Sequence, residues 1–195
     1  EKLVGDIETL ESYYRDRGFL KFSIESSQIS LSRDKKSIFI TYNINEGQKY
    51  TINDANVIGE IPFEEEIYID IINSLKDQTY SQAQITGIEE FFVNVLGNRG
   101  YAFAEVSGDA EVINDTNEVK LTFSVVPGNK TYTRKIIFTG NNVTQDHVLR
   151  REMRQFEGAW TSDNSIEAGK VRLERLGYFK EVNVETVPVV GTEDQ

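Results

Sequence analysis

Three stretches of the chain carry apolar residues three or four positions apart, the spacing of one face of a helix. The stripes are Leu3, Ile7, Leu10 and Tyr14, then Ile85, Ile88, Phe92 and Val95, and last Ile166, Gly169, Leu173 and Leu176. A glycine follows each stripe, at Gly18, Gly100 and Gly177, where a helix C-terminal cap favours a positive φ. The pattern predicts three helices, and within the third we expect Gly169 to admit the close approach of a strand.

Two other stretches alternate between apolar and polar residues, which is typical of half-buried strands. They are residues 38–44 and 119–125, which lie 81 positions apart. A partner strand is predicted before each, over 22–31 and 102–112, with a polar turn between the members of each pair. In the second pair we expect the apolar residues of the final strand to face helices: Val119, Leu121, Phe123 and Val125.

These elements belong to an internal repeat of about 80 residues. A glycine followed by an aromatic residue comes after each predicted helix, and the three glycines lie 82 and 77 residues apart. A second short motif, which ends in Gly59, recurs 81 residues later and ends in Gly140. One unit runs strand, helix, helix, strand, strand, and Pro62 and Thr144 are expected to start the first helix of two units. The predicted repeats, named first, second and third, are 1–46 with the last three elements, 47–130 with all five, and 131–195 with the first four. We therefore expect the chain to belong to a longer array.

The third repeat has no counterpart of the final strand, which in this topology lies between the first and the penultimate strands. Strands are predicted over 133–138 and 180–186 without a common partner, and each buried unpaired backbone group costs about 1–3 kcal/mol. We expect a strand from a neighbouring molecule, or residues 187–190, to fill the gap, or else this repeat to be loose. Trp160 is expected to pack beneath a helix.

Composition places the chain among globular proteins and excludes several functions. With 195 residues, 38% of them hydrophobic, the chain can bury a core, and no stretch reaches the length of a membrane span. The sequence contains no Cys, which excludes a disulfide framework, a cysteine nucleophile and a zinc finger. The net charge of −11 argues against nucleic-acid binding, and −9 of it falls within residues 47–130. The repeats therefore have different surfaces.

The repeated residues resemble a known family. A β-α-α-β-β unit with a Gly-aromatic step after its second helix resembles the POTRA (polypeptide-transport-associated) domain. Residues 149–160, LRREMRQFEGAW, and residues 5–10 with 12–14 resemble BamA members of the Omp85 family of outer-membrane β-barrel assembly proteins. The resemblance covers the whole chain and corresponds to the end of the third POTRA domain, the fourth, and most of the fifth. It implies an α+β fold of tandem repeats, each with two helices on a three-stranded mixed sheet.

The resemblance implies a non-enzymatic periplasmic scaffold that binds accessory lipoproteins and unfolded outer-membrane barrel precursors. The penultimate strand of each repeat is expected at a sheet edge, where it can template an added strand. Ile29 and Leu31 project from this strand in the first repeat, and the resemblance implies that they contact a BamB-like lipoprotein; the alternative is that both pack against helices. Other interpretations of the whole chain are another Omp85 or two-partner-secretion transporter, or an α+β hydrolase or ligand-binding domain with a deep polar pocket.

A second candidate surface consists of Arg150, Arg154 and Glu157. Spacings of four and seven place the three side chains on one face of a predicted helix. By itself the pattern is also typical of a solvated charged face that adds little stability. The resemblance implies contact with a BamD-like lipoprotein, whose carboxylates the arginines could bind.

Catalytic candidates are weak. His147 is the only histidine, and it lies beside Asp146 at the start of a predicted helix, with no cysteine or Gly-x-Ser-x-Gly motif in the chain. The acidic runs 64–66 and 89–90 fall in helical segments, where a solvated face is expected rather than a metal site or an acid–base pair. We expect no enzyme, no metal site and no cofactor.

Overall fold

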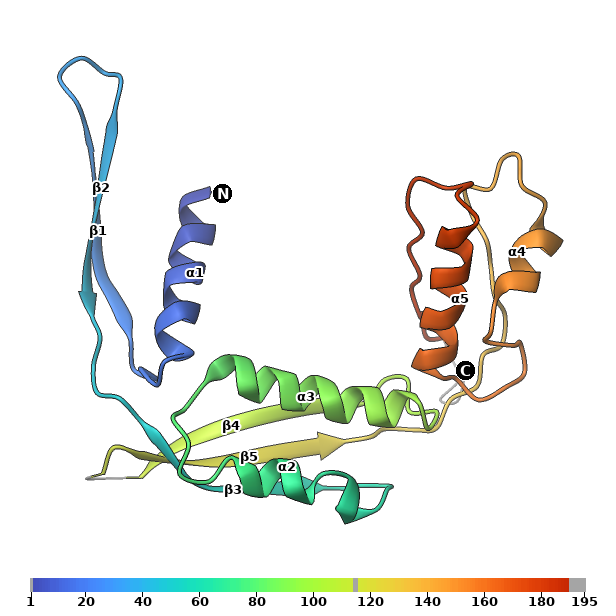
Figure 1. The fold of residues 1–195 in the computed structure, drawn as a ribbon, viewed down its shortest axis with the longest axis horizontal. Helices are drawn as coiled ribbons and strands as arrows, with labels where there is room; N and C mark the ends of the chain where they lie inside the picture. Colours follow the sequence, from blue (N-terminus) through green and yellow to red (C-terminus); the bar gives the residue numbers. More distant parts are fainter. Residues whose placement is uncertain (1, 114–115, 190–195) are drawn as a thin grey trace. The chain divides into compact units, whose positions relative to one another are not determined.

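The computed structural model describes residues 2–113 and 116–189 (Figure 1). The chain divides into two compact units. One contains Glu1–Ile58, Glu64–Glu89 and Gly108–Ser124, and the other contains Gly59–Phe63, Glu90–Ser107 and Val125–Gln195. Each unit contains part of the second repeat, so the limits of the units differ from the repeat boundaries at 46 and 130. The division into three repeats stays a prediction from the sequence.

The first repeat forms helix α1 (Lys2–Arg15) and an antiparallel hairpin of β1 (Ser23–Leu31) and β2 (Ile38–Asn45). The strands predicted over 22–31 and 38–44 are confirmed to within one residue. Near the end of α1 the ring of Tyr14 stacks on buried Phe22, with 4.2 Å between the ring centroids. The Tyr14 hydroxyl donates a hydrogen bond to the Glu46 carboxylate at 3.0 Å, which ties α1 to the residue that follows β2.

The second repeat contains all five predicted elements. They are β3 (Thr51–Gly59), a short 3-10 helix η1 (Glu65–Ile67) with α2 (Ile69–Ser74), α3 (Gln82–Gly97), β4 (Glu105–Ile113) and β5 (Glu118–Val126). The strand order is β3-β5-β4, which confirms that the final strand lies in the middle and the penultimate strand at an edge.

Buried apolar side chains of the second repeat come from both helices and from the sheet. Along β5, buried positions alternate with half-buried or exposed ones, as the period of two requires. Each fully buried side chain of this size stabilises the fold by about 1.5–3 kcal/mol. The buried set includes Ile52, Ile72, Ile85, Ile88, Phe92, Leu96, Val119, Leu121, Phe123 and Val125.

The third repeat contains α4 (Asp146–Glu152) and α5 (Asp163–Arg175), with a small core of Leu149, Met153 and Leu173. The prediction of regular strands over 133–138 and 180–186 is wrong: neither segment forms a strand in the described chain. The physical reason is the missing ladder partner. β5 pairs with both outer strands in the second repeat, and the described residues of the third repeat contain no equivalent. The predicted use of residues 187–190 reaches Val190, which lies outside the described residues.

Two predicted helix starts are displaced. Gln145, not Thr144, is the N-cap of α4, and its side chain makes no capping hydrogen bond. The first helical turn after Pro62 begins only at Glu65. In both places the polar or proline signal lies one to three residues too early, and the cap residues Glu64 and Gln145 are still extended.

The glycines at the helix ends have the positive φ that the sequence predicted, whereas two packing expectations are wrong. Gly18, Gly100 and Gly177 have φ of 99°, 98° and 67°, as predicted for helix caps. A Cβ at Gly169 would lie 3.0 Å from the Met153 sulfur, so that residue accommodates the end of α4 rather than a strand. Trp160 does not pack beneath a helix: it is 56% exposed.

Candidate partner-binding surfaces

The hairpin of β1 and β2 carries exposed apolar side chains near its turn. Ile29 lies opposite Ile40, and Leu31 lies opposite Ile38. Directly paired residues of an antiparallel ladder share one face of the sheet. The two predicted residues are 60% and 56% exposed, and their two partners are 44% and 64% exposed. We call these four residues the hairpin face.

The counterpart of the hairpin face is buried in the second repeat. Ile38 and Ile40 correspond to Val119 and Leu121, 81 positions later, and both of these are 0% exposed. The hairpin face is therefore the side on which helices pack in a complete repeat. Helix packing and partner contact, the two interpretations of Ile29 and Leu31, both use this face, and within the described residues it stays exposed.

In the third repeat, Arg150 connects α4 to two neighbouring segments. Its guanidinium pairs with Asp146 in α4, contacts Glu157 Oε1 at 2.9 Å, and donates a hydrogen bond to the Ile136 carbonyl oxygen at 2.8 Å. Glu157 Oε1 also accepts a hydrogen bond from the Ile136 N–H at 2.8 Å. Arg150 and Glu157 thus hold the loop after α4 against the segment that begins the repeat.

These contacts stabilise the charged form of both side chains. Two hydrogen bonds lower the pKa of Glu157 below its ordinary value: the one from the Ile136 N–H has the larger effect, and the one from Arg150 the next. Hydrogen bonds to Asp146 and then to Glu157 raise the pKa of Arg150. Arg150 and Glu157 therefore have partners within the chain, although each side chain is about 40% exposed.

Arg154 does not lie on the helical face predicted for it. α4 ends at Glu152, and Met153 is already extended with ψ of 144°, so a spacing of four no longer brings Arg150 and Arg154 together. Arg154 is exposed, and no described acidic residue forms an ion pair with it. Of the three predicted residues, the structure brings Arg150 and Glu157 into contact and leaves Arg154 as a separate exposed cation.

The structure contains two contacts of acidic residues that the sequence did not predict. In the third repeat, Arg172 of α5 donates to Glu152 Oε2 from Nε at 3.2 Å and from Nη2 at 2.9 Å, and this lowers the pKa of Glu152. In the second repeat, Glu89 accepts a hydrogen bond from the Gly108 N–H of β4 at 2.6 Å, so the expectation of a purely solvated acidic face is wrong for this residue. The partners lie 20 and 19 positions apart, beyond any helical or strand period.

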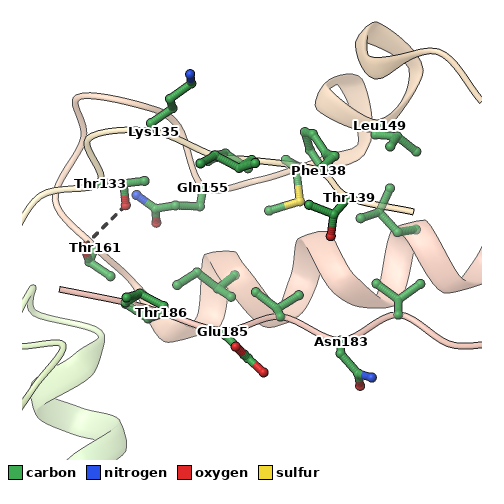
Figure 2. Close-up of a pocket in the computed structure, with 18 of the residues that line it drawn as sticks. Thr133, Lys135, Phe138, Thr139, Leu149, Gln155, Thr161, Asn183, Glu185 and Thr186 are labelled. Atoms are coloured by element: carbon green, nitrogen blue, oxygen red, sulfur yellow. Dashed lines mark hydrogen bonds between the residues drawn. The ribbon is translucent and has the colours of Figure 1, made fainter. Parts of the chain in front are cut away.

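A groove of about 490 Å³ opens in the third repeat (Figure 2). Its walls are the extended segments 131–139 and 181–189, and its lining includes the buried Leu149, Met153 and Leu173. The hydroxyl oxygens of Thr133 and Thr161 lie 3.4 Å apart in the lining. The wall segments correspond to β3 and β4 of the second repeat, so the groove has the position that β5 occupies there.

The described residues contain neither a metal-binding cluster nor a membrane-spanning helix. Within 2–113 and 116–189, no group of three His, Cys, Asp or Glu side chains is placed to hold a metal ion. His147 is exposed in the first turn of α4. In the same ranges, no helix combines the length and the apolar character needed to cross a membrane. The expectation that the chain is no enzyme stays a prediction.

Comparison with known proteins covers all three repeats. The model of the family POTRA, "Surface antigen variable number repeat", matches residues 1–47, 50–128 and 131–195. The chain belongs to the POTRA family. The α+β class of tandem POTRA repeats, predicted from the sequence, is thereby confirmed.

The relatives and solved structures point to one group within this family. The chain is 30% identical over 196 residues to the outer membrane protein assembly factor BamA of Neisseria meningitidis, and 29% identical over 184 residues to that of Buchnera aphidicola. These alignments cover 100% and 94% of this chain but only 25% and 30% of the relatives. The chain thus spans about a quarter of their length.

One solved structure matches along the whole chain. The crystal structure of Haemophilus influenzae BamA POTRA3-5 aligns with a TM-score of 0.91 at 29% identity, covering 100% of this chain and 77% of that one. BamA from Haemophilus ducreyi lacking POTRA domains 1–3 aligns with a TM-score of 0.64 at 36% identity over 75% of this chain and 28% of that one. The predicted resemblance to the third, fourth and fifth POTRA domains of BamA is confirmed.

Proposed function

We propose that this chain is part of a periplasmic scaffold for the assembly of outer-membrane β-barrel proteins, where it binds accessory lipoproteins and unfolded barrel precursors. The observation that carries the proposal is the likeness along the whole chain to POTRA domains 3–5 of BamA. The identity to curated outer membrane protein assembly factors supports the same role. Repeats with exposed strand edges and apolar faces suit a scaffold better than a hydrolase, which needs convergent titratable groups in an enclosed pocket.

Precursor binding is assigned to β4. This strand lies at an edge of the sheet, and on its outer side it pairs with no described strand. Such an edge presents N–H and C=O groups to which an extended segment can add as a further strand. Because the contacts are made by the main chain, they depend little on sequence, which suits a scaffold that receives many different precursors.

Lipoprotein binding is assigned to two surfaces. The hairpin face offers four exposed aliphatic side chains in adjacent positions, and an apolar cluster of this kind is typical of a protein contact. Exposed Arg154 lies in the loop that Arg150 and Glu157 hold in place, and its guanidinium can bind a partner carboxylate through two parallel hydrogen bonds. We assign the hairpin face to a BamB-like lipoprotein and Arg154, with Arg150 and Glu157, to a BamD-like one.

The experiment measures binding of the chain to each purified lipoprotein by biolayer interferometry. Ile29→Asp is compared with Ser30→Asp, which places the same charge on the other face of the same strand. Arg154→Glu is compared with Arg151→Glu, a neighbouring exposed arginine. We expect Ile29→Asp to weaken binding of the BamB-like protein at least tenfold and Arg154→Glu to weaken binding of the BamD-like protein, while each control binds like the parent. Equal losses in a variant and its control would contradict the assignment of that surface.

A further inference from the structure

Where one repeat meets the next, the same contacts occur twice along the chain. At the first joint, the Tyr50 N–H donates a hydrogen bond to the Gly18 carbonyl oxygen at 2.8 Å. The Asp16 carboxylate accepts one from the Ala83 N–H at 2.8 Å. All four residues lie in one compact unit, together with the isolated antiparallel bridge between Thr51 and Thr79.

The second joint repeats these contacts 81 or 82 positions later, inside the other compact unit. The Thr131 N–H donates to the Gly100 carbonyl oxygen at 2.7 Å. The Asn98 side-chain oxygen accepts a hydrogen bond from the Asn164 N–H at 2.8 Å. An isolated bridge between Tyr132 and Trp160 corresponds to the one between Thr51 and Thr79. The internal repeat therefore extends to the contacts between its units.

The side-chain contact is a helix cap supplied by the neighbouring repeat. Ala83 and Asn164 lie in the first turns of α3 and α5, where the backbone N–H groups have no acceptor within the helix. An aspartate or asparagine oxygen usually caps such a group from the residue just before the helix. Here Asp16 and Asn98 do so from 67 and 66 positions away, so a repeat that turns against its neighbour loses the cap.

The glycine at each joint has close neighbours. A Cβ on Gly18 would lie 2.7 Å from Thr79 Cγ2 of the second repeat, and one on Gly100 would lie 2.9 Å from Lys130 Cε of the same repeat. The glycine accepts the backbone hydrogen bond while the residue two positions before it supplies the cap. Two separate contacts restrain rotation, whereas one hydrogen bond alone would act as a pivot.

At the end of α5, the position equivalent to Asp16 and Asn98 holds no residue that can act as a cap. Arg175 stands two positions before Gly177, in the place of Asp16 and Asn98. A guanidinium has donors and no acceptor, so it cannot cap the N-terminus of another helix. A Cβ on Gly177 would have no described neighbour within 4 Å. An oxygen-bearing residue two positions before the glycine is thus common to the two joints between repeats, and Arg175 stands in its place at the end of α5.

We propose that Asp16 and Asn98 are positioning residues that fix each repeat on the next through a helix cap that crosses the joint. The chemistry required is a side-chain oxygen, which explains why aspartate serves at one joint and asparagine at the other. The contacts at the joints lie within the chain and do not depend on the proposed partners.

The test measures distance distributions between pairs of spin labels by electron paramagnetic resonance. The sequence has no native Cys, so each label is placed unambiguously. Exposed Glu8 in α1 and Asp70 in α2 report across the first joint, and Asp70 with Glu111 in β4 reports within the second repeat. Each pair is introduced as two substitutions to cysteine in the 195-residue chain.

The informative variants all alter the N-terminus of α3. Asp16→Ala removes the cap that crosses the joint, and Asp16→Asn keeps an oxygen, as Asn98 does at the other joint. Ser81→Ala is the matched control, because Ser81 Oγ caps the Gln84 N–H at 3.3 Å from within the same repeat. Ala83→Pro removes the donor instead, and proline is tolerated in the first turn of a helix.

We expect Asp16→Ala and Ala83→Pro to broaden the distribution across the joint at least twofold and to leave the pair within the second repeat unchanged. Asp16→Asn and Ser81→Ala should keep the width of the parent. A parental width in both Asp16→Ala and Ala83→Pro would overturn the proposal, and so would equal broadening in Ser81→Ala. Asn98→Ala, with labels at exposed Val93 and Ala168, repeats the test at the second joint.

Discussion

The pair Gly59 and Gly140 offers a matched test of how the central strand constrains a repeat. Both glycines have positive φ, at 105° and 82°, and they occupy equivalent positions 81 residues apart. An added Cβ at Gly59 would lie 2.1 Å from the Val125 carbonyl oxygen of β5. The same atom at Gly140 would have no described neighbour within 4 Å. The two positions share the backbone conformation and differ in whether a central strand lies beside them.

The magnitudes follow from this difference. Placing an L-residue at positive φ costs about 1–2 kcal/mol, and this applies to both sites. Crowding against a backbone atom forces β3 and β5 apart and adds about 1–3 kcal/mol, which applies only to Gly59. We expect Gly59→Ala to lower the free energy of unfolding by about 2–5 kcal/mol and Gly140→Ala by about 1–2 kcal/mol.

Urea unfolding followed by two probes separates the sites. Trp160 is the only tryptophan, so its fluorescence reports on the third repeat, while far-ultraviolet circular dichroism reports on all helices and strands. Because repeats can unfold in separate steps, each transition is fitted on its own. Gly59→Ala should shift a circular dichroism transition well below that of the parent. The reasoning fails if Gly59→Ala costs no more than Gly140→Ala.

Three further predictions concern single side chains. Phe123→Ala should cost about 3–5 kcal/mol in urea unfolding, because this side chain of β5 is 0% exposed; a loss below 1 kcal/mol would contradict its place in the core. Glu157→Gln, which removes only the charge, should lower the melting temperature of the third repeat at pH 7, measured by Trp160 fluorescence. The pKa of Glu157 is lowered, so its stabilisation is present above the ordinary glutamate pKa and is lost as the pH falls through the lowered one; a difference that persists in strong acid would refute this cause. Burial raises the pKa of Asp163, so Asp163→Asn should increase stability at pH 7 and lose this advantage in acid, in paired urea titrations; destabilisation at pH 7 would refute it.

Short sequence periods predicted the second repeat well. The alternation in 119–125 identified β5, and its four apolar residues are buried as expected. The alternation depends on neighbours two positions apart, which are visible in one sequence. The position of β5 in the middle of the sheet was implied by the resemblance to POTRA domains.

The third repeat shows where such periods stop being informative. The spacing of Arg150 and Arg154 predicts a single helical face, but α4 ends between the two residues. It ends there because Met153 is extended and packs in the core. The strand predicted over 133–138 does not form without a ladder partner. Contacts between distant positions, such as the one between Glu152 and Arg172, leave no periodic signal in the sequence.

Direct observation of a precursor segment on β4 tests the central claim. The measurement is a nuclear magnetic resonance titration of the isotopically labelled chain with a synthetic strand from an outer-membrane barrel protein, followed by hydrogen exchange of the backbone amides. The account predicts chemical-shift changes and slower exchange concentrated in Glu105–Ile113, because an added strand pairs with the outer edge of β4. Unchanged shifts and exchange rates throughout β4 at saturating peptide would contradict the account.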